Sequence, residues 1–210
     1  TQYTPYYLHS AGRAQGLHGD GTLSPQEPAG GEAADLFLSN PDSPVGTIGA
    51  AGINDQRAAE ERTDVLVYTT APLARPLEVT GPVRLVLHAG TSAADADWVA
   101  RLVDVSPEGY AANLCDGILR AGYRESRSQS RPLDPGRVYE FHVDMLMTSN
   151  LFRAGHRIRL EVTSSCFPKF DRNPNTGEPA ALARAPQPAL QRVYHDASRP
   201  SHVLLPVIPR

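Results

Sequence analysis

The sequence has few of the features that would point to a membrane or to nucleic acid. None of its hydrophobic runs approaches the roughly 20 residues that a membrane-spanning helix needs, and no signal-peptide pattern is visible at its start. Its 20 basic residues are dispersed, and Lys169 is the one lysine among them. Because nucleic-acid binding requires a concentrated basic face, neither nucleic acid nor a membrane is an expected partner. We expect a soluble protein of the bacterial cytoplasm, although composition leaves the compartment open.

Cysteine is also scarce. Cys115 and Cys166 are the two cysteines in 210 residues, and sequence alone cannot place their Cα atoms within bridging distance. Both lie near strand-like runs, where a free thiol behaves as a small buried hydrophobe. Two buried thiols are therefore favoured, and a disulfide stays the alternative.

The strongest pattern that is present lies in residues 137–166, RVYEFHVDMLMTSNLFRAGHRIRLEVTSSC. Apolar and charged residues alternate over residues 139–145 and again over residues 157–163. A period of two places the apolar set on one face of a pleated strand and the charged set on the other. We therefore predict two strands that form one side of a sandwich and whose outer face meets solvent.

Further strand-like segments recur along the chain between turn-forming residues. We predict strands over residues 3–9, 22–24, 65–68, 77–79, 82–89, 98–105, 110–119, 192–195 and 202–208, and helical turns over 54–61 and 118–124, while residues 35–38 hold only an apolar pattern. Asn54 is the expected N-cap of the first turn. Arg101 is expected to mark a face that opens toward a sheet edge, and Pro206 to place the last strand at an edge, since proline lacks an amide donor.

These segments predict an all-β, mostly antiparallel jelly-roll β-sandwich in one domain. The sandwich core is expected in residues 63–210. Residues 1–62 are expected to supply an N-terminal strand and a long irregular arm of the same domain. The many Pro and Gly residues of this region allow two interpretations: an arm that lies on a neighbouring surface, or a disordered linker.

Five segments stand in a recognisable order: RTDVLVYTT (62–70), LEVTGPV (77–83), DADWVARLVDVSP (95–107), GHRIRLEVTSSCFPKFDRNPNTG (155–177) and PSHVLLPVI (200–208). Together they resemble the C-terminal jelly-roll, galactose-binding-like domain of the Xaa-Pro dipeptidyl-peptidase and cocaine-esterase family of α/β-hydrolases. The resemblance implies a parent serine hydrolase acting on esters or amides, with a Ser-Asp-His triad on another domain. In that family, segments similar to residues 1–62 lie between the catalytic domain and the sandwich, and the resemblance therefore favours the arm over the disordered linker.

No catalytic residue of that family can be placed on this chain. It contains no G-x-S-x-G motif and no alternation of strands and helices that would build a parallel sheet. The resemblance therefore implies a non-catalytic domain that packs on an α/β-hydrolase domain, in the same chain or a separate one, stabilises it and shapes its substrate entrance or an oligomer contact. The chain begins at Thr1 and is expected to be trimmed or cut from a longer product.

Candidate partners and sites follow from residue type. Tyr3, Tyr6 and Tyr7 are the interface candidates, because tyrosine buries an apolar body while its hydroxyl stays hydrated. A homo-oligomer is a further option, and no cofactor is expected. Asp95 and Asp97, with Asp104 nearby, are weak candidates for a calcium site, since that ion takes clustered carboxylates but no full ligand loop is visible.

Two other functions are weighed against the family reading. A new triad would draw on His195 and Asp196 with Ser164, Ser165, Ser198, Ser201 or His202, yet consecutive strand residues point to opposite faces and would not pair. The alternative function is a free-standing carbohydrate-binding module, with a stacking platform made of Trp98, Tyr110, Tyr123 and Phe170. Trp98 alternates with Ala100 and Leu102, which favours a place in the core instead.

Overall fold

The chain is almost entirely β-structure. The computed structural model describes residues 1–49, 52–179, 182–183 and 185–209. Its strands are β1 (Gln2–His9), β2 (Thr22–Ser24), β3 (Asp35–Ser39), β4 (Leu66–Thr69), β5 (Leu77–Thr91), β6 (Asp97–Val105), β7 (Ala111–Arg120), β8 (Tyr139–Phe152), β9 (Arg157–Thr163), β10 (Ala189–Tyr194) and β11 (His202–Ile208). Two short helical turns accompany them, α1 (Arg57–Glu60) and the 3-10 turn η1 (Ala121–Tyr123).

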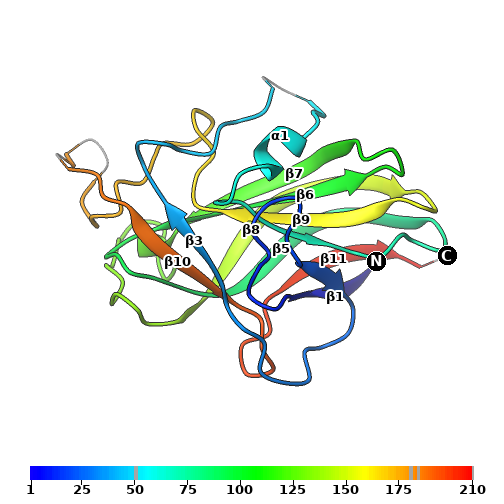
Figure 1. Cartoon of the computed structure of the whole chain (residues 1–210), viewed down its shortest axis with the longest axis horizontal. Helices are drawn as coiled ribbons and strands as arrows, with labels where there is room; N and C mark the ends of the chain where they lie inside the picture. The colour runs from blue at the N-terminus through cyan, green and yellow to red at the C-terminus, as the bar shows by residue number, and fades with distance from the viewer. Residues whose placement is uncertain (50–51, 180–181, 184, 210) are drawn as a thin grey trace.

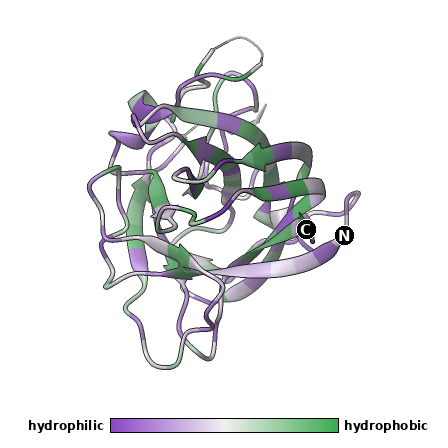
Figure 2. Ribbon diagram, turned by 90° about the vertical axis from the view of Figure 1, so that its right-hand side faces the viewer, coloured by the Kyte–Doolittle hydropathy of each residue, from purple (hydrophilic) through white to green (hydrophobic). Residues whose placement is uncertain are grey.

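The strands form one sheet that folds over on itself. Its order is β3-β10-β5-β11-β1-β2-β4-β9-β6-β7, and β8 adds to β5 outside this path. The pairs of named strands are antiparallel apart from the short β2–β4 pair, so the predicted all-β, mostly antiparallel fold is confirmed. The strands enclose one interior (Figures 1 and 2). Folding brings β8 close to β7, where a Cβ added to Gly117 would lie 2.0 Å from the carbonyl oxygen of Asp144.

Large aromatic and aliphatic side chains fill the interior. Trp98, Tyr68, Phe141 and Phe152 are among the largest side chains that are fully buried, and the rings of Trp98 and Phe141 lie 5.7 Å apart. They come from β4, β6 and β8, so the inner faces of strands from distant parts of the chain meet in one core. Burial of this apolar area is the main force that holds the two layers together.

The two strands predicted from residues 137–166 are present as β8 and β9, but they do not form one side of the sandwich. β8 pairs with β5, whereas β9 lies between β4 and β6. Along the first half of β8, buried and exposed residues alternate as predicted. From Ile158 to Thr163, β9 is buried on both faces, so the predicted solvent-exposed outer face is wrong for β9.

Three further expectations are corrected inside the sheet. β5 is one continuous strand whose register against β8 shifts between Pro82 and Arg84, instead of two strands separated by a turn. β11 lies between β1 and β5, so Pro206 does not mark an edge; the register against β5 shifts between Leu204 and Val207, which accommodates the missing amide. Arg101 lies in the central strand β6 and is 4% exposed, because its charge is paired.

The helical turns are shorter than predicted. α1 begins at Arg57, and its N-cap is Gln56, which makes no side-chain capping bond. Asn54 is not the N-cap; its backbone N–H donates to the side-chain oxygen of Asn113 on β7. In the second region β7 continues to Arg120, and only η1 is helical.

Residues 1–62 lie against the rest of the sandwich. β1 pairs with β11, β2 with β4, and β3 with β10. The described residues 40–49 and 52–62, which we call the covering segment, follow β3 in the chain, and Glu60 of this segment accepts a hydrogen bond from Arg159 on β9. Val45 and Ala59 of this segment form a small second apolar cluster with Val65 and Val67. The covering segment is therefore anchored by hydrophobic contacts at Val45 and Ala59.

Candidate functional site

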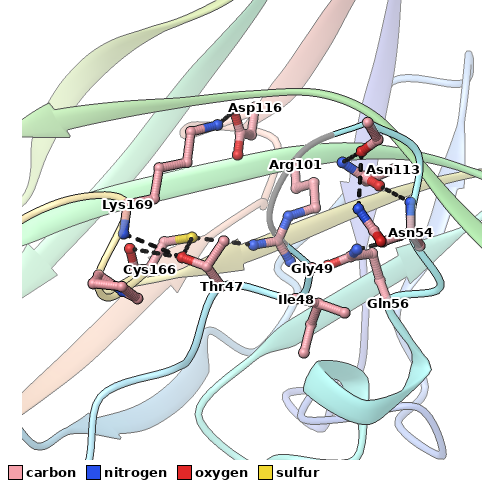
Figure 3. Close-up of a pocket in the computed structure, with 12 residues that line it drawn as sticks. Thr47, Ile48, Gly49, Asn54, Gln56, Arg101, Asn113, Asp116, Cys166 and Lys169 are labelled. Carbon is pink, nitrogen blue, oxygen red and sulfur yellow. Dashed lines mark hydrogen bonds and ion pairs between the residues drawn. The ribbon is translucent and has the colours of Figure 1, made fainter.

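A cavity of about 410 Å³ opens between the covering segment and the outer face of β6 and β7 (Figure 3). Thr47 and Gln56 approach it from the covering segment, Arg101 from β6, and Cys166 and Lys169 from the chain that follows β9. The folding of the covering segment over the sheet thus creates a concave, polar surface that no single stretch of sequence contains. Such convergence of polar groups in a concavity is typical of binding sites.

The charged groups of the cavity already have partners. The Lys169 Nζ lies 2.5 Å from Asp116 Oδ1. The Arg101 Nη1 donates to Glu161 Oε2 at 2.5 Å, and its Nη2 lies 3.5 Å from the Cys166 Sγ. The buried Gln56 donates through Nε2 to the carbonyl of Asn54, while its Oε1 has no hydrogen-bond donor among the described residues. The cavity can therefore bind polar groups, but its described lining residues do not place a nucleophile beside a base.

A second polar cluster lies where β10 ends, and the sequence analysis did not find it. His195 is fully buried; its Nδ1 is 3.0 Å from Glu32 Oε2, and its Nε2 is 2.9 Å from Asp35 Oδ2. Ser10 Oγ is 3.1 Å from the same Nε2 and donates to Asp35. Asp35 also accepts from the Tyr68 hydroxyl at 2.7 Å. Serine, histidine and acid residues far apart in the chain thus meet.

This cluster is arranged as an ion-pair network and not as a catalytic triad. Burial on its own would lower the pKa of His195, but the hydrogen bonds and charges of Asp35 and Glu32 together raise it. Burial works to raise the pKa of Asp35, yet its hydrogen bonds from His195, Ala14 N–H, Tyr68 and Ser10 lower it. With an acid at each ring nitrogen, His195 donates from both and keeps no lone pair for the Ser10 proton.

The sequence-based triad residues are separated in the structure. Asp196 accepts from Ser198 and Arg199 and closes the turn after β10, while His195 points to Asp35. These bonds lower the pKa of Asp196 to about 2, although burial opposes them. Ser201 donates to the carbonyl of Tyr194 and accepts from the His88 amide. The expectation that His195 and Asp196 diverge is confirmed.

Asp95 and Asp97, the weak candidates for a calcium site, accept hydrogen bonds from nitrogen donors. Asp97 accepts from Arg120 at 2.9 and 3.0 Å, and Asn173 Nδ2 bridges Asp97 and Asp95. Burial raises the pKa of Asp97, and Arg120 acts in the opposite direction. Asp104 lies at the far end of β6, about 20 Å away by strand geometry, and contacts His156. Asp95 and Asp97 therefore meet an arginine and an amide at the positions that a cation would take.

The aromatic residues do not form a stacking platform. Trp98 is fully buried against Phe141, so it cannot meet a sugar. Tyr123 and Phe170 line one shallow surface depression near the end of β7, whereas Tyr110 lies just before the first residue of that strand. The core position predicted for Trp98 is confirmed. The alternative hypothesis of a carbohydrate-binding module therefore lacks the tryptophan of its proposed stacking platform.

The tyrosine interface candidates of β1 fall on different faces. Tyr3 is 53% exposed. The Tyr7 hydroxyl donates to Glu27, and its ring packs 5.2 Å from that of His202. Tyr6 packs against the main core, and burial raises its pKa. Of the three, Tyr3 keeps most of its side chain available to a neighbouring surface.

The two cysteines are free thiols in this structure. Cys166 is buried and Cys115 is half-buried. Burial, and to a smaller extent the charge of Asp116, raises the pKa of Cys115 to about 12, so its thiol stays protonated.

Comparison with known proteins shows which family shares this sequence and architecture. A family model described as the X-Pro dipeptidyl-peptidase C-terminal non-catalytic domain matches residues 1–204. Cocaine esterase of Rhodococcus sp. (strain MB1 Bresler) is 44% identical over 220 residues, which cover 100% of this chain and 38% of the esterase.

Solved structures agree with that match. An aminopeptidase from a marine sediment archaeon, Thaumarchaeota archaeon, superposes with a TM-score of 0.90 at 34% identity, over 100% of this chain and 37% of its own. An α-amino acid ester hydrolase superposes with a TM-score of 0.89 at 34% identity, over 98% of this chain and 36% of its own. The chain thus spans little more than a third of the relatives that it matches.

Proposed function

Because this chain belongs to the family of X-Pro dipeptidyl-peptidase C-terminal non-catalytic domains, we propose that it serves as the accessory domain of a serine hydrolase acting on esters or amides. The observation that carries the proposal is the family match over residues 1–204 together with the 36–38% of each relative that the chain spans. The three relatives are named as an esterase, an aminopeptidase and an ester hydrolase, all of which act at an acyl carbon.

The arrangement of polar groups supports an accessory role. Among the described residues, Ser10 and His195 come closest to a nucleophile with its base, and two acids hold the imidazole in its charged form. The activity therefore depends on a domain outside this chain. We propose that the sandwich packs on that α/β-hydrolase domain, stabilises it and shapes its substrate entrance.

Surface apolar groups support a packing role. Leu36 and Leu38 are 41% and 55% exposed on β3, which ends the sheet, and Tyr3 is exposed on β1. Exposed apolar and tyrosine side chains are favoured where a second protein surface covers them. No helix in the described ranges is both long and apolar enough to span a membrane.

Three measurements test the proposal. The intact mass of the natural gene product should lie far above the 22.7 kDa of this chain, and that product should hydrolyse a chromogenic ester that the isolated chain leaves intact. A natural product of 22.7 kDa without a hydrolase partner, or ester turnover by the isolated chain, would contradict it. In the longer product, Leu38→Ser should lower the thermal stability of the hydrolase activity, with the covered Tyr7→Phe as a comparison variant.

A further inference from the structure

Two buried polar side chains line the 410 Å³ cavity, and the described residues do not fully satisfy either of them (Figure 3). Gln56 is 1% exposed, and its Oε1 has no hydrogen-bond donor among those residues. Arg101 is 4% exposed, and its Nη2 contacts the Cys166 Sγ at 3.5 Å, which is a weak acceptor. Because an unsatisfied buried polar group costs free energy, the pair fits a ligand that supplies both an N–H and a C=O.

The charges around the cavity neutralise one another. Arg101 is paired with Glu161, and Lys169 is paired with Asp116. Because each charge already has its counter-charge, the cavity does not select an ion. The neutral group that carries both an N–H donor and a C=O acceptor is the amide, which is present in the peptide backbone and in Asn and Gln side chains.

The rim of the cavity carries exposed apolar side chains. Ile53 is 64% exposed and stands between the lining residues Gly52 and Asn54. Phe167 is 42% exposed and precedes the lining residue Pro168. A small molecule inside the cavity would leave both apolar side chains in water, whereas a protein surface laid over the cavity would cover them. The rim therefore favours a protein as the partner.

The two walls of the cavity are fastened to each other by hydrogen bonds. The Phe167 N–H donates to the carbonyl of Val45 at 2.9 Å, and the Thr47 N–H donates to the carbonyl of Phe167 at 2.8 Å. The Val45 N–H donates to the Ser165 Oγ at 2.8 Å. The walls are thus preformed, and a partner that docks here loses little free energy in ordering them.

We propose that this cavity is the docking site of the hydrolase domain, which inserts an amide group toward Gln56 and Arg101 and covers Ile53 and Phe167. The inference rests on the proposed function, because it names the surface by which the accessory domain meets its partner. The chain spans 36–38% of each relative that it matches, so most of such a protein lies outside it and has to contact some face of the sandwich.

Lys169 provides a direct test, because it is the one lysine of this chain, lines the cavity and has a side chain that is 43% exposed. The natural gene product is treated with an amine-acetylating reagent, and labelling is followed by peptide mass spectrometry. Lys169 should react at least about tenfold more slowly than a lysine introduced by Arg127→Lys at an exposed position, since the reagent reaches a docked side chain only when the domains separate.

Two further variants show whether docking is the cause of slow labelling. Asp116→Asn removes the ion pair that slows the reaction of Lys169 even without a partner, and Lys169 should stay shielded in this variant. Equal rates at Lys169 and the introduced lysine in Asp116→Asn would overturn the proposal. Phe167→Ser removes an apolar contact of the rim and should raise the rate at Lys169, whereas the matched control Met147→Ser, at a 72% exposed position of β8, should not.

The activity and the mass of the same samples separate this inference from the proposed function. If Lys169 is labelled freely in a product that is far larger than 22.7 kDa and hydrolyses a chromogenic ester, docking at this cavity is wrong and the proposed function stands. Shielding that disappears when the product is diluted to its monomer would assign the cavity to a second copy. Shielding that disappears after exhaustive dialysis would assign it to a small molecule, and either result would overturn the proposal.

Discussion

β8 and β9 show two uses of the same alternating pattern. Both strands turn apolar residues inward and charged residues outward, but the outward residues of β8 border solvent, whereas those of β9 are buried and contact α1. On β8 the outward Glu140 and His142 pair at 2.9 Å on the exposed surface. On β9 the outward Arg159 and Glu161 are buried and bind Glu60 and Arg101. The charged face of a strand can therefore be a binding surface for the protein's own chain.

The largest difference between the two strands should appear when a glutamate is removed from each. Glu161→Ala leaves the buried Arg101 without its carboxylate, and we expect a loss of about 3–5 kcal/mol in the free energy of unfolding. Urea unfolding measures it, with the slope expected to stay unchanged. Glu140→Ala on β8 is the matched control and should cost less than about 1 kcal/mol. Equal losses would mean that the covering segment does not bury the outer face of β9.

A smaller loss is expected at the buried carboxylate of Asp35. Asp35→Ala removes the shared acceptor of Tyr68, Ser10 and His195, and should cost about 3–4 kcal/mol, since three buried donors are left unpaired at about 1 kcal/mol or more each. Tyr68→Phe removes one of these bonds and should cost about 1 kcal/mol. Thermal and urea unfolding compare the two. A Tyr68→Phe loss as large as that of Asp35→Ala would show that the network does not act through Asp35.

The Asp35 cluster should also show its own pH dependence. The pKa of His195 lies above its ordinary value of 6.5. Its charge therefore contributes fully to the free energy of unfolding below pH 6.5, and this contribution is lost as the pH rises through the raised pKa. The pKa of Asp35 lies below 3.8, so its contribution is lost only as the pH falls through that lowered value. Subtracting the stability curve of His195→Gln from that of the natural chain should give a difference that shrinks toward alkaline pH. Parallel curves would contradict the charged imidazole.

The smallest effect is expected on the hydrated face of β8. His142→Thr replaces an exposed side chain by one that suits a pleated surface, and should change the unfolding free energy by less than about 0.5 kcal/mol. Urea unfolding measures this change. A loss above 1 kcal/mol, on the order of a buried hydrogen bond, would show that this face is covered in the protein as it folds.

The sequence was sufficient to predict the strands because alternation is local. Most strand segments, including β1, β2, β7 and β11, lie within a few residues of their predicted positions. Where two strands were merged into β5, the turn signal of Gly81-Pro82 was overridden by pairing with β8 over the whole length. Local patterns state which residues share a face, but not what lies against that face.

The polar clusters could not be predicted for the same reason. Ser10 and His195 are 185 positions apart, and Glu60 and Arg159 are 99 positions apart. Their meeting depends on where the covering segment crosses the sheet, which no spacing encodes. If β9 had been predicted as a buried strand, each of its charges would have needed a partner, and Glu60 of α1 was a weak signal of such a partner.

The position of β11 has a consequence for the order of events during protein synthesis. β11 lies between β1 and β5, and Gln2 stands opposite Val207, so the two ends of the chain lie close together (Figure 1). While this sequence emerges from a ribosome, β1 and β5 each lack a neighbour until the last residues are exposed. The sandwich can then close only after translation of residue 208, and the unpaired edges of β1 and β5 are the surfaces that a chaperone would need to shield until that moment.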